Sequence, residues 1–181
     1  MAYNYKLTKF ESFEILKKTL YILLLLVTFQ GFAQKTLDQL LQQYNTHSVP
    51  YISVEGLRAL QVNEEIILLD TREASEFSVS NIEGSQCVGF NNFSAEEISE
   101  AIEDKDTPIV VYCSLGIRSE QVGEKLQKAG FTNVKNLYGG IFEWKNKGYP
   151  ILDSKKIETD TVHTFSKLWS KWLLKGIPMY E

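Results

Sequence analysis

The sequence of 181 residues is poor in metal-binding and cross-linking side chains. It contains two cysteines and two histidines, which are too few for a Cys/His zinc site or a disulfide scaffold. We therefore expect no metal and no cofactor. Acidic residues outnumber basic ones by 23 to 19, and the chain has no dense cluster of Lys and Arg. This argues against a nucleic acid as the main partner.

The overall composition is that of an ordinary globular protein. Apolar residues make up 44% of the chain and charged residues 23%, which are typical values for a soluble domain. The length is enough for one domain with a hydrophobic core. Collagen, a coiled coil and wholesale disorder are excluded by this composition.

Residues 1–33 have the layout of a secretory signal peptide. The pair Lys17-Lys18 precedes a short apolar core over residues 19–29, and residues 31–33 (Gly-Phe-Ala) supply the small residues of a cleavage site. The apolar core is shorter than the roughly 20 residues that span a bilayer. We expect a periplasmic or secreted protein, with an uncleaved anchor in the inner membrane as the alternative.

Hydrophobic patterning in the following part of the chain predicts an α/β fold. Unbroken apolar runs at residues 66–69 and 108–112 suit strands that are buried on both faces of a parallel sheet. Two weaker strands are expected at residues 85–89 and 134–137. Helices are expected at residues 36–44, 53–60, 73–77, 94–102, 119–129 and 141–147. This alternation predicts a mainly parallel central sheet flanked by helices.

The predicted organisation places one domain at residues 51–150, after an N-terminal helix and connector at residues 34–50. Residues 151–181 are expected to form a linker and a C-terminal amphipathic helix. In that tail, apolar residues recur at helical spacing within residues 164–175. We expect this helix to fold back on the domain. Contact with a partner or with a membrane surface is the alternative.

The segment that carries chemistry follows the second buried strand and opens a helix. Backbone N–H groups and the helix dipole converge at such a turn and can hold an anion. A cysteine placed there, Cys113, should ionise easily beside a cation such as Arg118. Its thiolate could accept sulfur as a persulfide and pass it to a second nucleophile. We assign Cys113 as the catalytic residue and expect substrate binding by Ser114, Leu115, Gly116, Ile117, Arg118 and Ser119.

Five segments, in order and at matching spacing, resemble the rhodanese family. They are Leu69-Asp70-Thr71-Arg72-Glu73 with Glu76-Phe77, Asn81-Ile82-Glu83-Gly84-Ser85, Val111-Tyr112-Cys113 through Arg118-Ser119, Gly130-Phe131-Thr132-Asn133-Val134, and Leu137-Tyr138-Gly139-Gly140-Ile141-Phe142-Glu143-Trp144. The resemblance covers about residues 53–150. It implies a sulfurtransferase that moves sulfane sulfur from a donor such as thiosulfate or polysulfide to a thiol or cyanide acceptor. Four residues separate Cys113 from Arg118, as in sulfurtransferases, whereas the related cell-cycle phosphatases carry one more.

The same resemblance indicates supporting residues and departures. Asp70 and Arg72 are expected to brace the site, and Arg72 could pair with Glu76. Asn81, Glu83 and Gly89 stand where the family usually has histidine, proline and proline. Ser114 occupies a position where thiosulfate-active members often carry a cation, and Leu115 and Ile117 make the mouth of the loop apolar. The expected affinity for the dianion thiosulfate is therefore weak.

A second hypothesis is a redox or partner-binding module of low turnover on the same fold. In that case Cys113 would sense oxidants, or the tail helix would recruit a partner. The remaining cysteine, Cys87, is expected to belong to the core. A disulfide with Cys113 is the alternative role for it.

Overall fold

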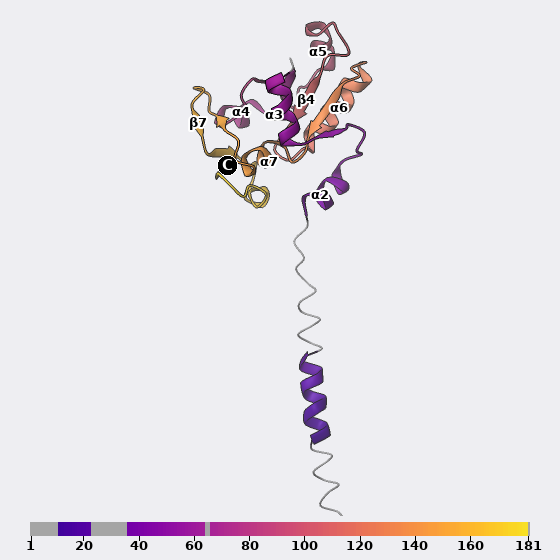
Figure 1. The fold of residues 1–181 in the computed structure, drawn as a ribbon, viewed down its shortest axis with the longest axis vertical. Helices are drawn as coiled ribbons and strands as arrows, with labels where there is room; N and C mark the ends of the chain where they lie inside the picture. The colour runs from indigo at the N-terminus through magenta and orange to yellow at the C-terminus, as the bar shows by residue number, and fades with distance from the viewer. Residues whose placement is uncertain (1–10, 23–35, 64–65, 181) are drawn as a thin grey trace, which may run out of the picture. The chain divides into compact units, whose positions relative to one another are not determined.

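The computed structural model describes residues 11–22, 36–63 and 66–180 (Figure 1). The chain divides into two compact units, Met1–Thr36 and Leu37–Glu181. In the first unit, residues 11–22 form a helix. The predicted cleavage site at residues 31–33 lies outside the described residues. Within the described ranges, no helix has the length and apolar character needed to cross a membrane.

A five-stranded parallel sheet forms the centre of the second unit. Its strand order is β1-β5-β4-β2-β3, and the strands are β1 (Tyr51–Ile52), β2 (Ile67–Asp70), β3 (Ser85–Cys87), β4 (Ile109–Tyr112) and β5 (Val134–Leu137). The two predicted apolar runs are the adjacent inner strands β2 and β4. Asp70 pairs with Tyr112 at their carboxyl ends, so the residues that follow both strands emerge at the same edge.

Helices cover both faces of the sheet, as the sequence predicts. They are α2 (Leu37–Tyr44), α3 (Val54–Asn63), α4 (Ala74–Val79), α5 (Ala95–Ala101), α6 (Arg118–Lys128) and α7 (Gly140–Asn146). One apolar cluster joins the sheet to α3 and α7 and includes Leu57, Leu68, Val110, Tyr112 and Ile141. A second cluster joins the opposite face to α6 and includes Leu69, Val111, Val122 and Leu126. Strand side chains alternate between the two clusters because successive residues of a strand point to opposite faces.

The predicted linker and long tail helix are wrong. Residues 151–180 instead form an antiparallel hairpin of β6 (Ile151–Leu152) and β7 (Glu158–Thr159), then a parallel pair of β8 (Thr161–His163) and β9 (Ile177–Met179). Only α8 (Lys167–Ser170) is helical in the predicted span. A helix cannot begin earlier because Phe165 has a φ of 62°, which lies in the left-handed region.

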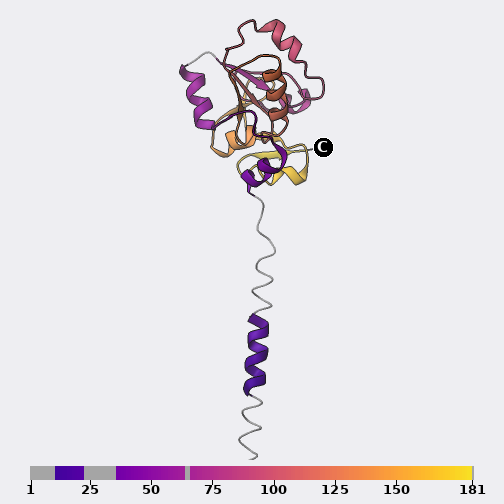
Figure 2. The same ribbon diagram turned by 90° about the vertical axis from the view of Figure 1, so that its right-hand side faces the viewer.

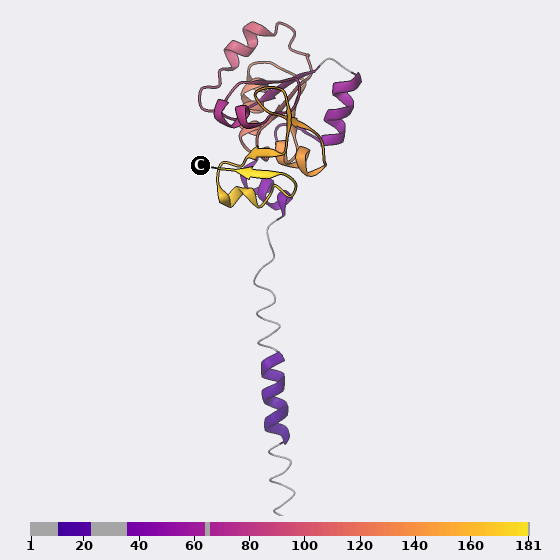
Figure 3. The same cartoon turned by 90° about the vertical axis from the view of Figure 1, so that its left-hand side faces the viewer.

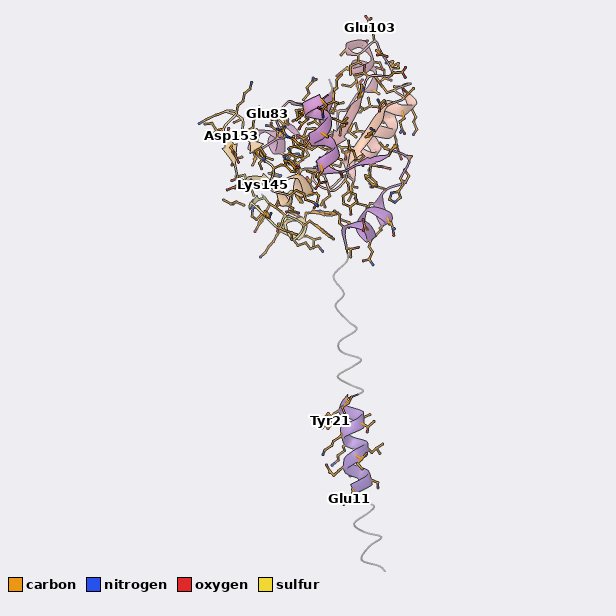
Figure 4. All side chains as sticks on the ribbon, in the orientation of Figure 1. Glu11, Tyr21, Glu83, Glu103, Lys145 and Asp153 are labelled. Atoms are coloured by element: carbon orange, nitrogen blue, oxygen red, sulfur yellow. The ribbon has the colours of Figure 1, made fainter. Side chains whose placement is uncertain are left out.

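Two side chains of α7, Asn146 and Lys145, hold this tail against the domain. The Asn146 side chain donates to the Trp172 carbonyl (2.9 Å) and accepts from the backbone N–H of Leu174 (2.6 Å) and Lys175 (3.1 Å). These bonds replace helical ones, which explains why the helix ends. Lys145, labelled in Figure 4, forms a 2.6 Å ion pair with Asp160. Figures 2 and 3 show the yellow C-terminal segment beside α7.

Candidate active site

The candidate active site is the loop between β4 and α6. Cys113 directly follows β4 and is only 2% exposed. The backbone N–H of Gly116 donates to the Cys113 sulfur at 3.1 Å, and the Ser119 hydroxyl lies 3.6 Å from the same atom. The converging donors expected at the turn into a helix are therefore present around one sulfur.

The surroundings of Cys113 favour its thiolate. Burial alone raises the pKa of this thiol, because a charge is less stable away from water. The positive charge of Arg118 and hydrogen bonds from the backbone of Ser119 and Leu115 are among the effects that outweigh burial and hold the pKa below its ordinary value. A lowered thiol pKa increases the fraction of nucleophilic thiolate near neutral pH.

Two buried asparagines fix the shape of the loop. Gly116 has a φ of 99°, so the loop makes a turn there that glycine adopts without strain. Its carbonyl oxygen accepts hydrogen bonds from the side chains of Asn45 (2.8 Å) and Asn136 (2.9 Å). These two bonds tie the turn of the loop to the connector after α2, which contains Asn45, and to β5, which contains Asn136.

Ser119 points toward Cys113 but has a closer partner. Its hydroxyl donates to the Asn136 carbonyl oxygen at 2.7 Å, and the Asn136 amide in turn donates to Glu120 at 3.0 Å. A hydroxyl has one proton, so the shorter bond to Asn136 takes it in this arrangement. Donation from the Ser119 hydroxyl to a persulfide on Cys113 would require this proton to turn from Asn136 to sulfur.

The backbone at the beginning of α7 donates hydrogen bonds to the loop. Backbone N–H groups of Ile141 and Phe142 donate to the carbonyls of Cys113 (2.9 Å) and Ser114 (3.2 Å). Gly140 makes this approach possible, because a Cβ added there would collide with the Cys113 carbonyl oxygen. The Gly139-Gly140 pair is thus part of the site's scaffold.

Arg118 is held in a two-pronged ion pair with Glu76 of α4. Its terminal nitrogens lie 2.6 and 2.8 Å from the two carboxylate oxygens, and one of them also donates to the Ser114 hydroxyl at 3.2 Å. Burial raises the pKa of Glu76, but the hydrogen bonds and charge of Arg118 outweigh it and lower that pKa. Arg118 therefore clamps the loop while its charge stays close to the thiol.

The predicted pair between Arg72 and Glu76 is wrong. Arg72 bonds instead to Asp70, with a shortest contact of 2.6 Å, and to the Ser80 carbonyl at 2.7 Å. Arg72 and Asp70 are both wholly buried, and each satisfies the other's charge away from water. Since Ser80 ends α4, this pair fixes the segment that presents Glu76 to Arg118, which is the bracing position expected for Asp70 and Arg72.

Cys87 is not a core residue, contrary to expectation. It ends the edge strand β3 and is exposed, because the edge of the sheet lacks a covering strand there. Cys87 pairs with Asp70 of β2, and Asp70 pairs with Tyr112, the neighbour of Cys113. With about 4.8 Å between strands, the Cα atoms of the two cysteines are roughly 10 Å apart. A disulfide needs less than about 7 Å, so the backbone would have to move.

The tail completes a pocket above Cys113 that the sequence did not predict. Its volume is about 170 Å³, and the loop lines it with Ser114, Leu115, Ile117 and Arg118. The tail adds Thr164, Phe165 and Trp169 to this lining. No local pattern in the sequence links residues 164–169 to Cys113. Asn136 was also missed, although a polar residue inside a predicted buried strand is a usable signal.

Known proteins match the central part of this chain. The rhodanese-like domain model matches residues 53–147, which is more than half of the chain. A tRNA uridine(34) hydroxylase from Protochlamydia amoebophila is 32% identical over 96 residues, which cover 50% of this chain and 30% of that protein. The chain thus matches about a third of the length of that relative.

Two solved structures share the fold. The rhodanese-like domain of an Anabaena sp. protein is 24% identical, with a TM-score of 0.52 over 57% of this chain and 79% of that chain. A thiosulfate sulfurtransferase from Pseudomonas aeruginosa is 24% identical, with a TM-score of 0.53 over 69% of this chain and 23% of that chain. Together with the parallel sheet and the cysteine loop, the match over residues 53–147 shows that this chain belongs to the rhodanese-like domain family.

Proposed function

We propose that this protein is a sulfurtransferase that carries sulfane sulfur as a persulfide on Cys113. The observation that carries the proposal is the cradle around this one buried sulfur. The Gly116 N–H lies 3.1 Å from it, and the charge of Arg118 helps lower its pKa. The same donors that favour the thiolate would favour the terminal sulfur anion of a persulfide.

The reaction would proceed in two half-reactions. The Cys113 thiolate attacks the outer sulfur of a donor such as thiosulfate or polysulfide. The bond from that sulfur to the rest of the donor breaks, and the electron pair leaves with the donor remnant. A thiol or cyanide acceptor then attacks the outer sulfur of the persulfide and releases Cys113 as a thiolate. No external oxidant or reductant is needed.

The names of similar proteins support this class of chemistry to different degrees. The thiosulfate sulfurtransferase shares the fold, and its name describes the transfer proposed here. The tRNA hydroxylase match covers only 30% of that protein, so we do not extend hydroxylation to this chain. The redox-module alternative rests on the same lowered pKa of Cys113, but Cys87 lies too far away to resolve it without backbone movement.

Turnover tests the proposal directly. The full chain is incubated with polysulfide or thiosulfate and cyanide, and thiocyanate release is measured. Cys113→Ala should lower the rate by at least about a thousand-fold, because it removes the nucleophile. Cys87→Ala is the matched control and should keep the wild-type rate. Equal rates for Cys113→Ala and wild type would overturn the proposal, and sulfenic acid on Cys113 without any thiocyanate would favour the redox module.

We also propose that the protein is exported. The support is the basic pair at residues 17–18, the apolar core at residues 19–29 and the small residues at 31–33. N-terminal sequencing of protein recovered from the periplasm of an expressing Gram-negative host should begin at Gln34. Recovery of uncleaved chain in the membrane fraction would instead favour the anchored alternative.

A further inference from the structure

Phe165 and Trp169 of the tail form an apolar wall of the pocket at Cys113. This wall points to a class of sulfur donor. We propose that Phe165 and Trp169 make this site selective for a monoanionic sulfane donor that carries an apolar substituent, such as an aryl or alkyl group. This inference rests on the proposed sulfur transfer. In this proposal, the tail residues determine which sulfur donor is preferred, and the loop alone does not.

The first argument is the shape and character of the pocket. Leu115 and Ile117 of the loop contribute apolar lining, and Phe165 and Trp169 of the tail add two aromatic side chains to it. The pocket volume of about 170 Å³ leaves room for a substituent beside the transferred sulfur. A donor group that fills this space removes apolar surface from water on both partners, which favours binding.

The second argument is charge. Among the described residues that line the pocket, Arg118 is the one that carries a charge, and both of its terminal nitrogens are bonded to Glu76. His163 lies 3.9 Å from Glu76 but accepts a hydrogen bond from the Phe165 N–H at its Nδ1. His163 is not among the described residues that line the pocket. A dianion such as thiosulfate would therefore lose hydration here without an unpaired cation from the described lining residues in return.

The third argument is the backbone of Phe165. Its φ of 62° lies in the left-handed region, which is unfavourable for a bulky side chain. The bond from its N–H to His163 (3.2 Å) holds this conformation, yet the Phe165 side chain stays 63% exposed and gains little from the core. A strained residue that presents a large apolar ring to the pocket is more simply explained by ligand contact than by packing.

The fourth argument is that the wall has a fixed base. Trp169 is half-buried and packs against the apolar cluster shared by α3 and α7. The Thr164 N–H donates to the Met179 carbonyl at 2.7 Å, which ties the start of the wall to β9. Phe165 therefore projects from a segment that is held at both ends rather than from a free terminus.

The transfer from such a donor balances without a further reagent. In an organic thiosulfonate, the Cys113 thiolate attacks the outer sulfur, the S–S bond to the sulfonyl sulfur breaks, and a sulfinate leaves with the electron pair. In an organic hydropersulfide the leaving group is the thiolate. Cys113 keeps the outer sulfur as a persulfide in both cases, and the apolar substituent stays on the leaving group, where the wall would contact it.

Three donors separate charge from apolar contact in the full chain. Thiosulfate is a dianion, methanethiosulfonate a small monoanion, and benzenethiosulfonate a monoanion with an aromatic group. For each we would measure kcat/KM for thiocyanate release in the presence of cyanide. Wild type should prefer benzenethiosulfonate to methanethiosulfonate, and both to thiosulfate. In Phe165→Ala/Trp169→Ala the ratio of the two thiosulfonates should fall about tenfold, the size expected when apolar contacts are lost from a pocket.

Controls separate the wall from general damage to the tail. Leu174→Ala changes an 80% exposed tail residue that does not line the pocket, and the donor ratio should stay at the wild-type value. Phe165→Ala alone removes an exposed ring and should lower the ratio in the same direction, even if the double variant folds poorly. An unchanged ratio in Phe165→Ala, or a wild-type preference for thiosulfate, overturns the inference while sulfur transfer stands. No turnover with any donor overturns both the inference and the proposed function.

Discussion

The two sides of the pocket above Cys113 are built in different ways. The loop side, residues 113–118, presents backbone N–H groups and one clamped cation, and buried side chains such as Asn136 hold its carbonyl groups. The tail side presents apolar side chains from a segment with little regular structure, and Phe165 is 63% exposed. Sulfur transfer needs the fixed hydrogen-bond donors of the loop side. Selection among sulfur donors can be set by the apolar side chains of the tail side.

This difference gives each side its own expected response to mutation. A change that moves the loop should alter the nucleophile itself, through its position or its pKa. A change that moves the tail should leave the nucleophile as it is and alter only what can bind above it. The following predictions test that separation, beginning with the largest expected effect.

Gly140→Ala should damage the loop most. The added Cβ would collide with the Cys113 carbonyl oxygen, so either the start of α7 or the loop has to move. A displacement of about 1 Å at a reacting atom can cost roughly a hundred-fold in rate, and thiocyanate release should fall by about that factor. The matched control is Gly130→Ala. Gly130 also has a positive φ of 98°, but a Cβ there meets no atom within 4 Å. Equal loss in both variants would show that backbone strain, and not the loop contact, is responsible.

Removal of the clamping ion pair should shift the pH dependence of Cys113. In Glu76→Gln/Arg118→Gln both charges are absent, and neither is left buried alone. Arg118 lowers the pKa of Cys113, so its loss should raise that pKa. The thiolate would then form only at higher pH. The midpoint of the alkylation rate against pH should therefore move upward.

The control for this shift is Lys125→Gln, which removes a cation near the far end of α6. Its alkylation midpoint should match that of wild type. A midpoint that stays in place in Glu76→Gln/Arg118→Gln would mean that Arg118 does not favour the thiolate.

Loosening the tail should have the smallest effect on the nucleophile. Asn146→Ala removes three hydrogen bonds to the segment around Trp172, each worth about 1 kcal/mol. Amide exchange at residues 172–175, measured by mass spectrometry, should accelerate at least about tenfold. The alkylation midpoint of Cys113 should not move. Asn63→Ala is the control, because its side chain donates to the Ala59 carbonyl within α3, away from the tail. A shifted midpoint in Asn146→Ala would show that the two sides of the pocket are coupled.

The loop side could be predicted largely from the sequence, and the tail side could not. Apolar runs such as residues 108–112 identify buried strands, and a Cys–Gly–Arg pattern after such a strand identifies an anion cradle. Both signals are local. The position of residues 164–169 over Cys113 depends instead on Asn146 and on the left-handed backbone of Phe165. Neither has a sequence pattern, and the apolar spacing there resembled an amphipathic helix.

Glu76 and Cys87 show where prediction from sequence patterns fails. Glu76 is close to Arg72 in the sequence, but in the structure it pairs with Arg118. The segments that follow β2 and β4 emerge at the same edge of the sheet, which brings these two residues together. The sequence predicts Cys87 in the core because it lies in a short strand, and short strands are usually buried. It lies on the edge strand β3, and strand order cannot be read from one strand's composition.

The most direct test of the account is an intact mass of the full chain after incubation with polysulfide. We predict a gain of one sulfur atom, which cyanide removes, which is absent in Cys113→Ala and which remains in Cys87→Ala. This result would establish Cys113 as the sulfur carrier. No adduct with any sulfane donor, or an adduct that persists in Cys113→Ala, would contradict the central claim.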